Sequence, residues 1–276
     1  GLQVLNIGVS TLLYENEDII TAVSSIAEAG HKRIELFCEI DGFRPGKVSD
    51  ETVDTLAALA LEHGITYSIH PPCIGLNPAS SDSSERARVV EAYIGTIELA
   101  TRLGIRDMVV HCGSKSDPRV PTEIALGFAR QTLQTVGDVA QQAGVVMMLE
   151  NTCWKETSIL ESPQALIDLA DLCPPSTCLL LDVGHAMIWG VNPTECARAW
   201  FPRLAQIHAH DNHGECDEHL PLGDGIIDWK ELISFLAMER WDGVFMIEVG
   251  QQEDSAEALE RSLDIVRECL AQCANA

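Results

Sequence analysis

Short apolar runs alternate with longer amphipathic stretches along the whole chain, and this alternation is its main structural signal. The apolar runs predict eight strands, at residues 5–9, 33–37, 65–69, 107–110, 145–149, 178–181, 204–207 and 243–247. The amphipathic stretches between them predict helices, and several of these end at a glycine, as at Gly64, Gly104 and Gly144. Continuous apolar strands joined by helices are typical of a parallel sheet that helices cover.

Eight strand-and-helix units in one chain favour a particular closed architecture. About 250 residues are typical of a (β/α)8 barrel, so we predict a single TIM-barrel domain, α/β with eight parallel strands, over residues 1–276. No linker or change in composition divides the chain. A doubly wound open sheet is the alternative, but it usually has fewer strands and often a glycine-rich phosphate loop after the first strand, which this sequence lacks.

Composition narrows the class of partner. The 276 residues carry a formal net charge of -24, which repels nucleic acid and anionic membrane surfaces. No apolar run approaches the roughly 20 residues of a membrane-spanning helix, and the first residues lack a signal-peptide pattern. The ten cysteines include no C-x-x-C pair and suit reduced thiols. We therefore expect a cytoplasmic protein that acts on a small molecule. Barrels of the predicted kind often pair, so a homodimer is a further expectation.

Residues that commonly bind metals follow the last six predicted strands, at or just beyond the carboxyl end of each. They are His70, His111, Glu150, Asp182 with His185, His208 with Asp217 and His219, and Glu248. In a (β/α)8 barrel these ends converge on the face that holds the active site. Without a cation, four clustered carboxylates would be protonated or would repel one another. The pattern predicts a divalent cation, and imidazole with carboxylate suits Zn, Mn, Co or Fe(II) better than Ca or Mg.

The segment 207–225 concentrates this chemistry, because it holds four histidines and five carboxylates but no lysine or arginine. Within it we expect His210, Asp211 and His213 to support the ligands rather than bind a metal themselves.

A second group of residues could contact a substrate. Trp154, Trp189 and Phe43 follow strands and could line a pocket, although ordinary packing explains them equally well. Lys115 is one of four basic residues placed to reach a substrate phosphate, and a solvated loop position is its other explanation.

Several motifs together resemble the xylose isomerase-like barrel superfamily, which contains sugar isomerases and epimerases and the endonuclease IV group. The similarity covers nearly the whole chain and is most specific at residues 149–152 (LENT), 182–185 (DVGH), 208–212 (HAHDN), 217–225 (DEHLPLGDG) and 247–248 (IE).

The isomerase branch implies one set of roles. There, the resemblance implies one divalent metal on Glu150, Asp182, His208 and Glu248, with Glu150 and Glu248 also moving a proton. It further implies substrate contact by His185, and Glu156 resembles an acid near the site of some epimerases. An arginine that these epimerases carry in the strand-seven loop has no counterpart here.

The endonuclease IV branch implies three zinc ions, and all nine of its ligands find a match: His70, His111, Glu150, Asp182, His185, His208, Asp217, His219 and Glu248.

Two enzymatic hypotheses follow from the sequence. The first is a metal-dependent isomerase or epimerase acting on a small sugar, polyol or sugar phosphate, with Glu150 and Glu248 as base and acid around one to three ions of Zn, Mn or Co. The second is a phosphoester hydrolase with two or three metals, acting on a small substrate rather than on DNA. A barrel that only binds a ligand is the non-enzymatic alternative.

Overall fold

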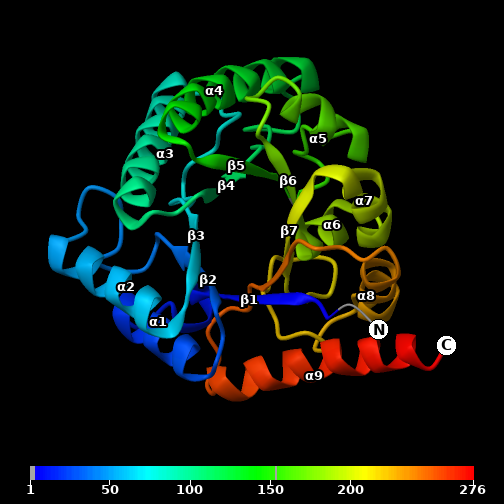
Figure 1. The fold of residues 1–276 in the computed structure, drawn as a ribbon. Helices are drawn as coiled ribbons and strands as arrows, with labels where there is room; N and C mark the ends of the chain where they lie inside the picture. Colours follow the sequence, from blue (N-terminus) through cyan, green and yellow to red (C-terminus); the bar gives the residue numbers. More distant parts are fainter. Residues whose placement is uncertain (1–3, 153) are drawn as a thin grey trace.

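The computed structural model describes residues 4–152 and 154–276, and within them eight parallel strands close into a barrel in the order of the sequence. Figure 1 looks along the barrel, with the helices forming an outer ring around the strands. The strands are β1 Asn6–Ser10, β2 Arg33–Phe37, β3 Thr66–His70, β4 Asp107–His111, β5 Val146–Glu150, β6 Cys178–Asp182, β7 Leu204–Ala209 and β8 Val244–Ile247. The predicted (β/α)8 barrel is confirmed, and the open sheet is excluded, because β1 pairs with both β2 and β8.

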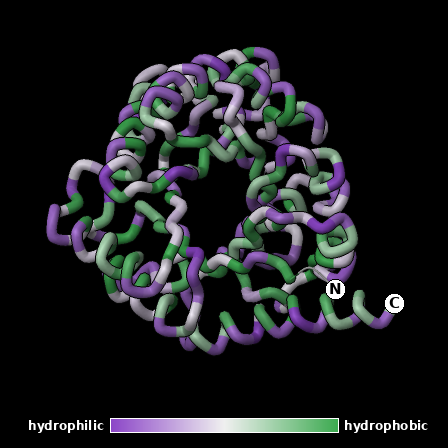
Figure 2. The backbone as a smooth tube through the Cα atoms, viewed as in Figure 1, coloured by the Kyte–Doolittle hydropathy of each residue, from purple (hydrophilic) through white to green (hydrophobic). Residues whose placement is uncertain are grey.

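The helices other than α6 lie where the amphipathic stretches predict them. They are α1 Ile19–Glu28, α2 Asp50–His63, α3 Ser83–Leu103, α4 Thr122–Ala143, α5 Pro163–Ala170, α6 Val183–Trp189, α7 Pro193–Trp200, α8 Trp229–Met238 and α9 Ser255–Ala274, with short 3-10 turns at Thr11–Tyr14 and Phe201–Arg203. In Figure 2 the outer helices alternate between purple and green turns, as amphipathic helices do. In the described part of the chain, no helix is both long enough and apolar enough to cross a membrane.

Local signals explain where several helices begin and end. Asp18, Ser49 and Asp82 each cap the start of a helix with a side-chain oxygen that accepts a backbone N–H. Gly64 and Gly144 end α2 and α4 with φ near 70°, a conformation that residues with a Cβ rarely adopt. Helix α6 is not anticipated by the sequence. It starts directly after β6, where Asp182 accepts a hydrogen bond from the His185 backbone N–H.

The alternation of side chains along each strand divides the barrel into an outer and an inner set. Outward residues such as Ile34, Leu36 and Phe245 are fully buried in the apolar core that the sheet shares with the helices. Inside the barrel, Val109, Met148 and Leu180 form a separate small apolar cluster. Each of these three lies two residues before a predicted ligand, so the ligands are the next inward residues toward the carboxyl end.

Candidate metal centre and active site

The barrel brings all nine predicted ligands to one end. His70, His111, Glu150 and Asp182 are the last residues of β3, β4, β5 and β6. His208 lies next to last in β7, and Glu248 follows β8 directly. Strand pairing sets His111 beside Glu150 and Asp182 beside His208. The parallel register therefore aligns these four side chains, while His185 reaches the site from α6, and Asp217 and His219 from the loop after β7.

Among residues 4–152 and 154–276, potential ligand atoms come together in five overlapping groups of three residues, in each of which they lie within 4.8 Å of one another. The groups are His70–His111–Glu150, Glu150–Asp182–His208, Glu35–His208–Glu248, His210–His219–Glu248 and His185–Asp217–His219. Each predicted ligand belongs to at least one group. Glu35 and His210 belong to groups as well, although the sequence analysis did not propose either of them as a ligand.

The histidine rings are oriented in a way that suits metal binding. Nδ1 of His70, His185 and His219 lies 2.8, 2.8 and 2.9 Å from the backbone carbonyls of Pro71, Asn151 and Glu248, respectively. A carbonyl only accepts hydrogen bonds, so each Nδ1 carries the hydrogen, and Nε2 is the atom available as a ligand. The Nε2 atoms of His185 and His219 lie 3.1 and 3.2 Å from Asp217 Oδ2.

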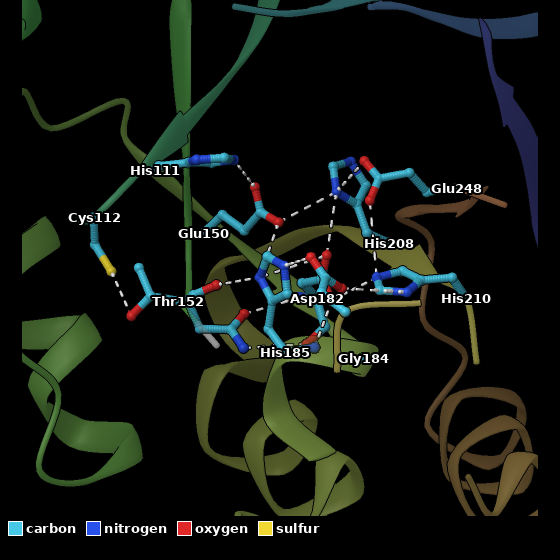
Figure 3. Close-up of polar contacts among 12 residues, drawn as sticks. His111, Cys112, Glu150, Thr152, Asp182, Gly184, His185, His208, His210 and Glu248 are labelled. Carbon is cyan, nitrogen blue, oxygen red and sulfur yellow. Dashed lines mark hydrogen bonds and ion pairs between the residues drawn. The ribbon is translucent and has the colours of Figure 1, made fainter. Parts of the chain in front are cut away.

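The ring of His208 is turned the other way, with Nδ1 and not Nε2 facing the site. Figure 3 shows it between Glu150 and Glu248, within the cluster that the predicted ligands form together with Glu35 and His210. His208 Nε2 lies 2.6 Å from Glu35 Oε1. Its Nδ1 faces three carboxylates, at 2.9 Å from Glu248 Oε2, 3.5 Å from Glu150 Oε1 and 3.9 Å from Asp182 Oδ2. These four residues are the ones that the isomerase branch implies as ligands of a single ion.

The electrostatics of the cluster are those of a cation site. Burial by itself lowers the pKa of His208, but Glu248, Glu35 and Glu150 outweigh it and hold that pKa well above its usual value. Burial likewise opposes the charge on His219, whose hydrogen bond and attraction to Asp217 raise its pKa to about 10. In Glu248, burial favours the neutral acid, yet His208 brings the pKa down to about 2. The carboxylates therefore stabilise a positive charge that lies among them.

Buried atoms without hydrogen-bond partners support the same conclusion. Among the described residues they include Glu150 Oε2, Asp182 Oδ2, Asp217 Oδ1 and Nδ1 of His208 and His210. Such atoms are rare inside proteins, because each loses its bonds to water without replacement. These five belong to the cluster, whereas a sixth such atom, Thr177 Oγ1, lies outside it. The mixture of imidazole and carboxylate among the five fits a borderline divalent cation such as Zn²⁺, Mn²⁺ or Co²⁺.

A cavity of about 370 Å³ opens over the cluster. Its walls contain Leu12, Glu15, Phe37, His70, Cys73, His111, Glu150, His185, Asp217, Glu218, His219, Glu248, Gly250, Gln251 and Gln252. None of these lining residues is a lysine or an arginine. The cavity therefore has an acidic floor, and its walls combine Glu15 and Glu218 with neutral and apolar residues.

Trp154, Glu156 and Lys115 are not among the residues that line this cavity. Trp154 and Glu156 are exposed in the loop after β5, and Lys115 is half-buried, with its backbone N–H bonded to the Thr157 carbonyl. Their contact with a substrate stays a prediction. Phe43 and Trp189 are buried in the apolar core and pack rather than line the cavity.

The three loop residues that we expected to support the ligands differ in position. His210 is fully buried, with Nε2 2.7 Å from Asp182 Oδ1 and its ring stacked on His219 at 3.9 Å. Asp211 instead organises its own loop, accepting hydrogen bonds from Gly223, Ile227 and Trp229. The expectation for His213 is wrong. It is exposed and bonds only with Glu218 within the loop, because the turn at Gly214 directs it to solvent.

The sequence analysis missed Glu35, a fully buried carboxylate in the middle of β2. A signal was available, since a glutamate between Ile34 and Leu36 interrupts an apolar strand at an inward position. Because it lies below the strand end, a search restricted to strand ends passes over it.

The protein is a (β/α)8 barrel with a cavity at the carboxyl end of its strands, and histidines and carboxylates line that cavity. Within that class, the chain belongs to the xylose isomerase-like TIM barrel family, whose model matches residues 23–269. The uncharacterized protein MJ1311 of Methanocaldococcus jannaschii is 30% identical over 277 residues, which cover 97% of this chain and 92% of that protein.

Solved structures share the fold over their whole length. The structure of a D-tagatose 3-epimerase-like protein is 28% identical, with a TM-score of 0.81 over 96% of this chain and 99% of the other. L-ribulose 3-epimerase is 19% identical, with a TM-score of 0.80 over 99% of this chain and 96% of the other. At that identity, the second likeness speaks for the fold alone.

Proposed function

We propose that this protein is a divalent-metal-dependent isomerase or epimerase of a small sugar or polyol. The observation that carries the proposal is the arrangement of two glutamates around His208. Glu150 and Glu248 each turn one carboxylate oxygen toward His208 Nδ1, at 3.5 and 2.9 Å. The likeness to a D-tagatose 3-epimerase-like protein, at 28% identity, supports an enzyme of this general kind.

Glu150, Asp182, His208 and Glu248 would hold the ion, whose role when bound is to polarise a substrate carbonyl. The second oxygen of each glutamate points elsewhere. Glu150 Oε2 lies 3.1 Å from His111 Nε2, and Glu248 Oε1 lies 3.6 Å from His219 Nδ1. Each glutamate therefore keeps one oxygen that is not turned toward His208. One would remove the proton next to the carbonyl, and the other would return a proton to the product.

The walls of the cavity favour an uncharged substrate over a phosphorylated one. Glu15 and Glu218 stand at the cavity together with the acidic floor, and the described lining offers no cationic side chain. A phosphate would meet repulsion from these carboxylates and would lack the bidentate partner that arginine provides. Glutamine side chains such as Gln251 and Gln252, in contrast, can bond with hydroxyl groups.

The test is solvent isotope exchange. The protein loaded with Mn²⁺ or Co²⁺ would be incubated in D₂O with a panel of ketoses, aldoses and ketones derived from polyols. Each compound would be compared with its phosphate ester. We expect deuterium at the carbon next to the carbonyl of an unphosphorylated substrate, and loss of that exchange in E150Q and E248Q. Absence of exchange across the panel, with the metal bound, would contradict the proposal.

A second candidate is a phosphoester hydrolase with two or three ions. The specific observation in its favour is that His70–His111–Glu150 and His185–Asp217–His219 form groups beside the central one. The metal content of the protein, together with turnover of phosphomonoesters and phosphodiesters, distinguishes the two. Two or three ions per chain with phosphate release would replace the first proposal, whereas one ion with isotope exchange would support it.

A further inference from the structure

Glu35 lies inside the barrel beneath the cluster, and three hydrogen-bond donors converge on it. His208 Nε2 lies 2.6 Å from its Oε1. Its Oε2 accepts from Gln206 Nε2 at 2.6 Å and from Ser68 Oγ at 2.7 Å. Glu35 lies on β2, Ser68 on β3, and Gln206 and His208 both on β7, all with inward side chains. The carboxylate is therefore held from more than one strand and cannot turn freely.

The direction of each bond follows from the chemistry of the groups. Glu35 Oε2 accepts from Gln206 and Ser68. A carboxylate has no hydrogen to donate, so Oε1 also accepts, and the shared hydrogen lies on His208 Nε2. The opposite orientation of the Gln206 amide would set its oxygen against Glu35 Oε2, where two acceptors would repel. Gln206 Nε2 also lies 3.1 Å from His208 Nε2, but both atoms then carry hydrogen, and the pair does not bond.

His208 differs from the other histidines in how its ring is held. His70, His185 and His219 each use a backbone carbonyl beyond a strand. His208 lies within β7, where the carbonyls point along the sheet toward the neighbouring strands β6 and β8 and not into the barrel. The group that accepts from its Nε2 is therefore a side chain, that of Glu35 on β2.

The layer beneath the ligands is polar only where His208 needs it. The inward residues below His111, Glu150 and Asp182 are Val109, Met148 and Leu180, an apolar cluster. Gln206 is the corresponding residue beneath His208 and Ser68 the one beneath His70; both bond with Glu35, and all three are buried. A buried charge is unfavourable unless it is paired. Apolar residues would fill this space at lower cost, so the carboxylate of Glu35 has a role beyond packing.

We propose that Glu35 is a positioning residue that fixes the tautomer and ring plane of His208, so that Nδ1 presents its lone pair to a divalent cation. The inference rests on the metal centre of the proposed function. A carboxylate that accepts from a metal-binding histidine fixes the orientation of its ring. Loss of such a carboxylate typically weakens metal affinity 10- to 100-fold. Glu35 itself stays an acceptor for His208 and does not touch the substrate.

The experiment compares metal binding by the full-length wild type, E35Q, S68A and E62Q. Zn²⁺ and Co²⁺ affinities are measured by competition with a chromophoric chelator, and the visible spectrum of bound Co²⁺ is recorded. In E35Q the amide can donate to Nε2 and favour the wrong tautomer, so we expect about a 10- to 100-fold loss of affinity and a changed spectrum. S68A leaves the acceptor of His208 in place and should lose less. E62Q makes the same chemical change on the exposed face of α2 and should match the wild type.

A second measurement does not depend on how a variant folds. ¹⁵N NMR of the histidines in the Zn²⁺-loaded wild type should report hydrogen on Nε2 of His208 and metal on its Nδ1, whereas His70, His185 and His219 should carry hydrogen on Nδ1. Equal affinity and an equal Co²⁺ spectrum in E35Q, or metal on Nε2 of His208, would overturn the inference while leaving the metal centre intact. A wild type that binds neither ion would instead overturn the metal centre itself, and the role of Glu35 with it.

Discussion

The glycine of the D-V-G-H motif allows one of the closest contacts in the site, and replacing it with alanine tests the geometry directly. A Cβ at Gly184 would lie 2.6 Å from His210 Nδ1 and closer still to Cε1. The ring would have to retreat by more than about 0.8 Å, because Cε1 is closer than Nδ1, to reach the 3.4 Å at which ordinary van der Waals contact begins. It cannot retreat freely, because Nε2 is bonded to Asp182 and the ring is stacked on His219.

The expected loss of stability in G184A combines two costs and one gain. Overpacking costs about 1–3 kcal/mol, and disrupting a hydrogen bond to a charged group costs about 1.5–3 kcal/mol. Alanine is favoured over glycine in a helix by about 1 kcal/mol, which offsets part of this in α6. The net loss is about 2–5 kcal/mol, which lowers Tm by about 4–10 °C for a chain of this length.

The matched control is G127A on the exposed face of α4. A Cβ at Gly127 meets nothing within 4 Å, so the helix preference acts alone. G127A should gain about 0.5–1 kcal/mol and raise Tm by about 1–2 °C. Thermal unfolding of both variants in excess chelator separates this effect from metal binding. A G184A protein as stable as the wild type would show that the contact between residue 184 and His210 is not as tight as the structure has it.

Three further outcomes are expected. Adding Mn²⁺, Co²⁺ or Zn²⁺ at about 100 times its Kd should stabilise the chelator-treated protein by about 2.7 kcal/mol, or about 5 °C in Tm, and D182N should reduce the shift; equal shifts in both proteins would place the ion elsewhere. L180A should lose about 2–5 kcal/mol in denaturant unfolding, because Leu180 is fully buried inside the barrel, whereas L61A, 88% exposed, should stay within about 0.5 kcal/mol. D18A should lose about 1 kcal/mol by the same measurement, because the Thr21 N–H loses its cap at 2.9 Å, and an unchanged midpoint would contradict that role.

The order of the elements was predictable because it depends on local patterns. Each strand is a short apolar run, and glycines such as Gly64 and Gly144 mark helix ends through their backbone conformation alone. Helix α6 escaped prediction because Val183 and Gly184 are poor helix formers, and tertiary packing with the cap at Asp182 stabilises the turn instead.

The candidate ligands were also readable from the sequence, since parallel strands in a barrel necessarily bring their carboxyl ends together. The sequence did not show which residues the candidate ligand side chains contact with their remaining atoms. The pairing of His208 with Glu35 joins residues 173 positions apart, and the stacking of His210 on His219 depends on how one loop folds back over the barrel. The sequence by itself determined the barrel and which residues gather at its end, because strand periodicity is local. Only the tertiary structure decided which ring nitrogen faces the site, which loop histidine turns to solvent and where a buried carboxylate lies, because these depend on contacts between distant strands.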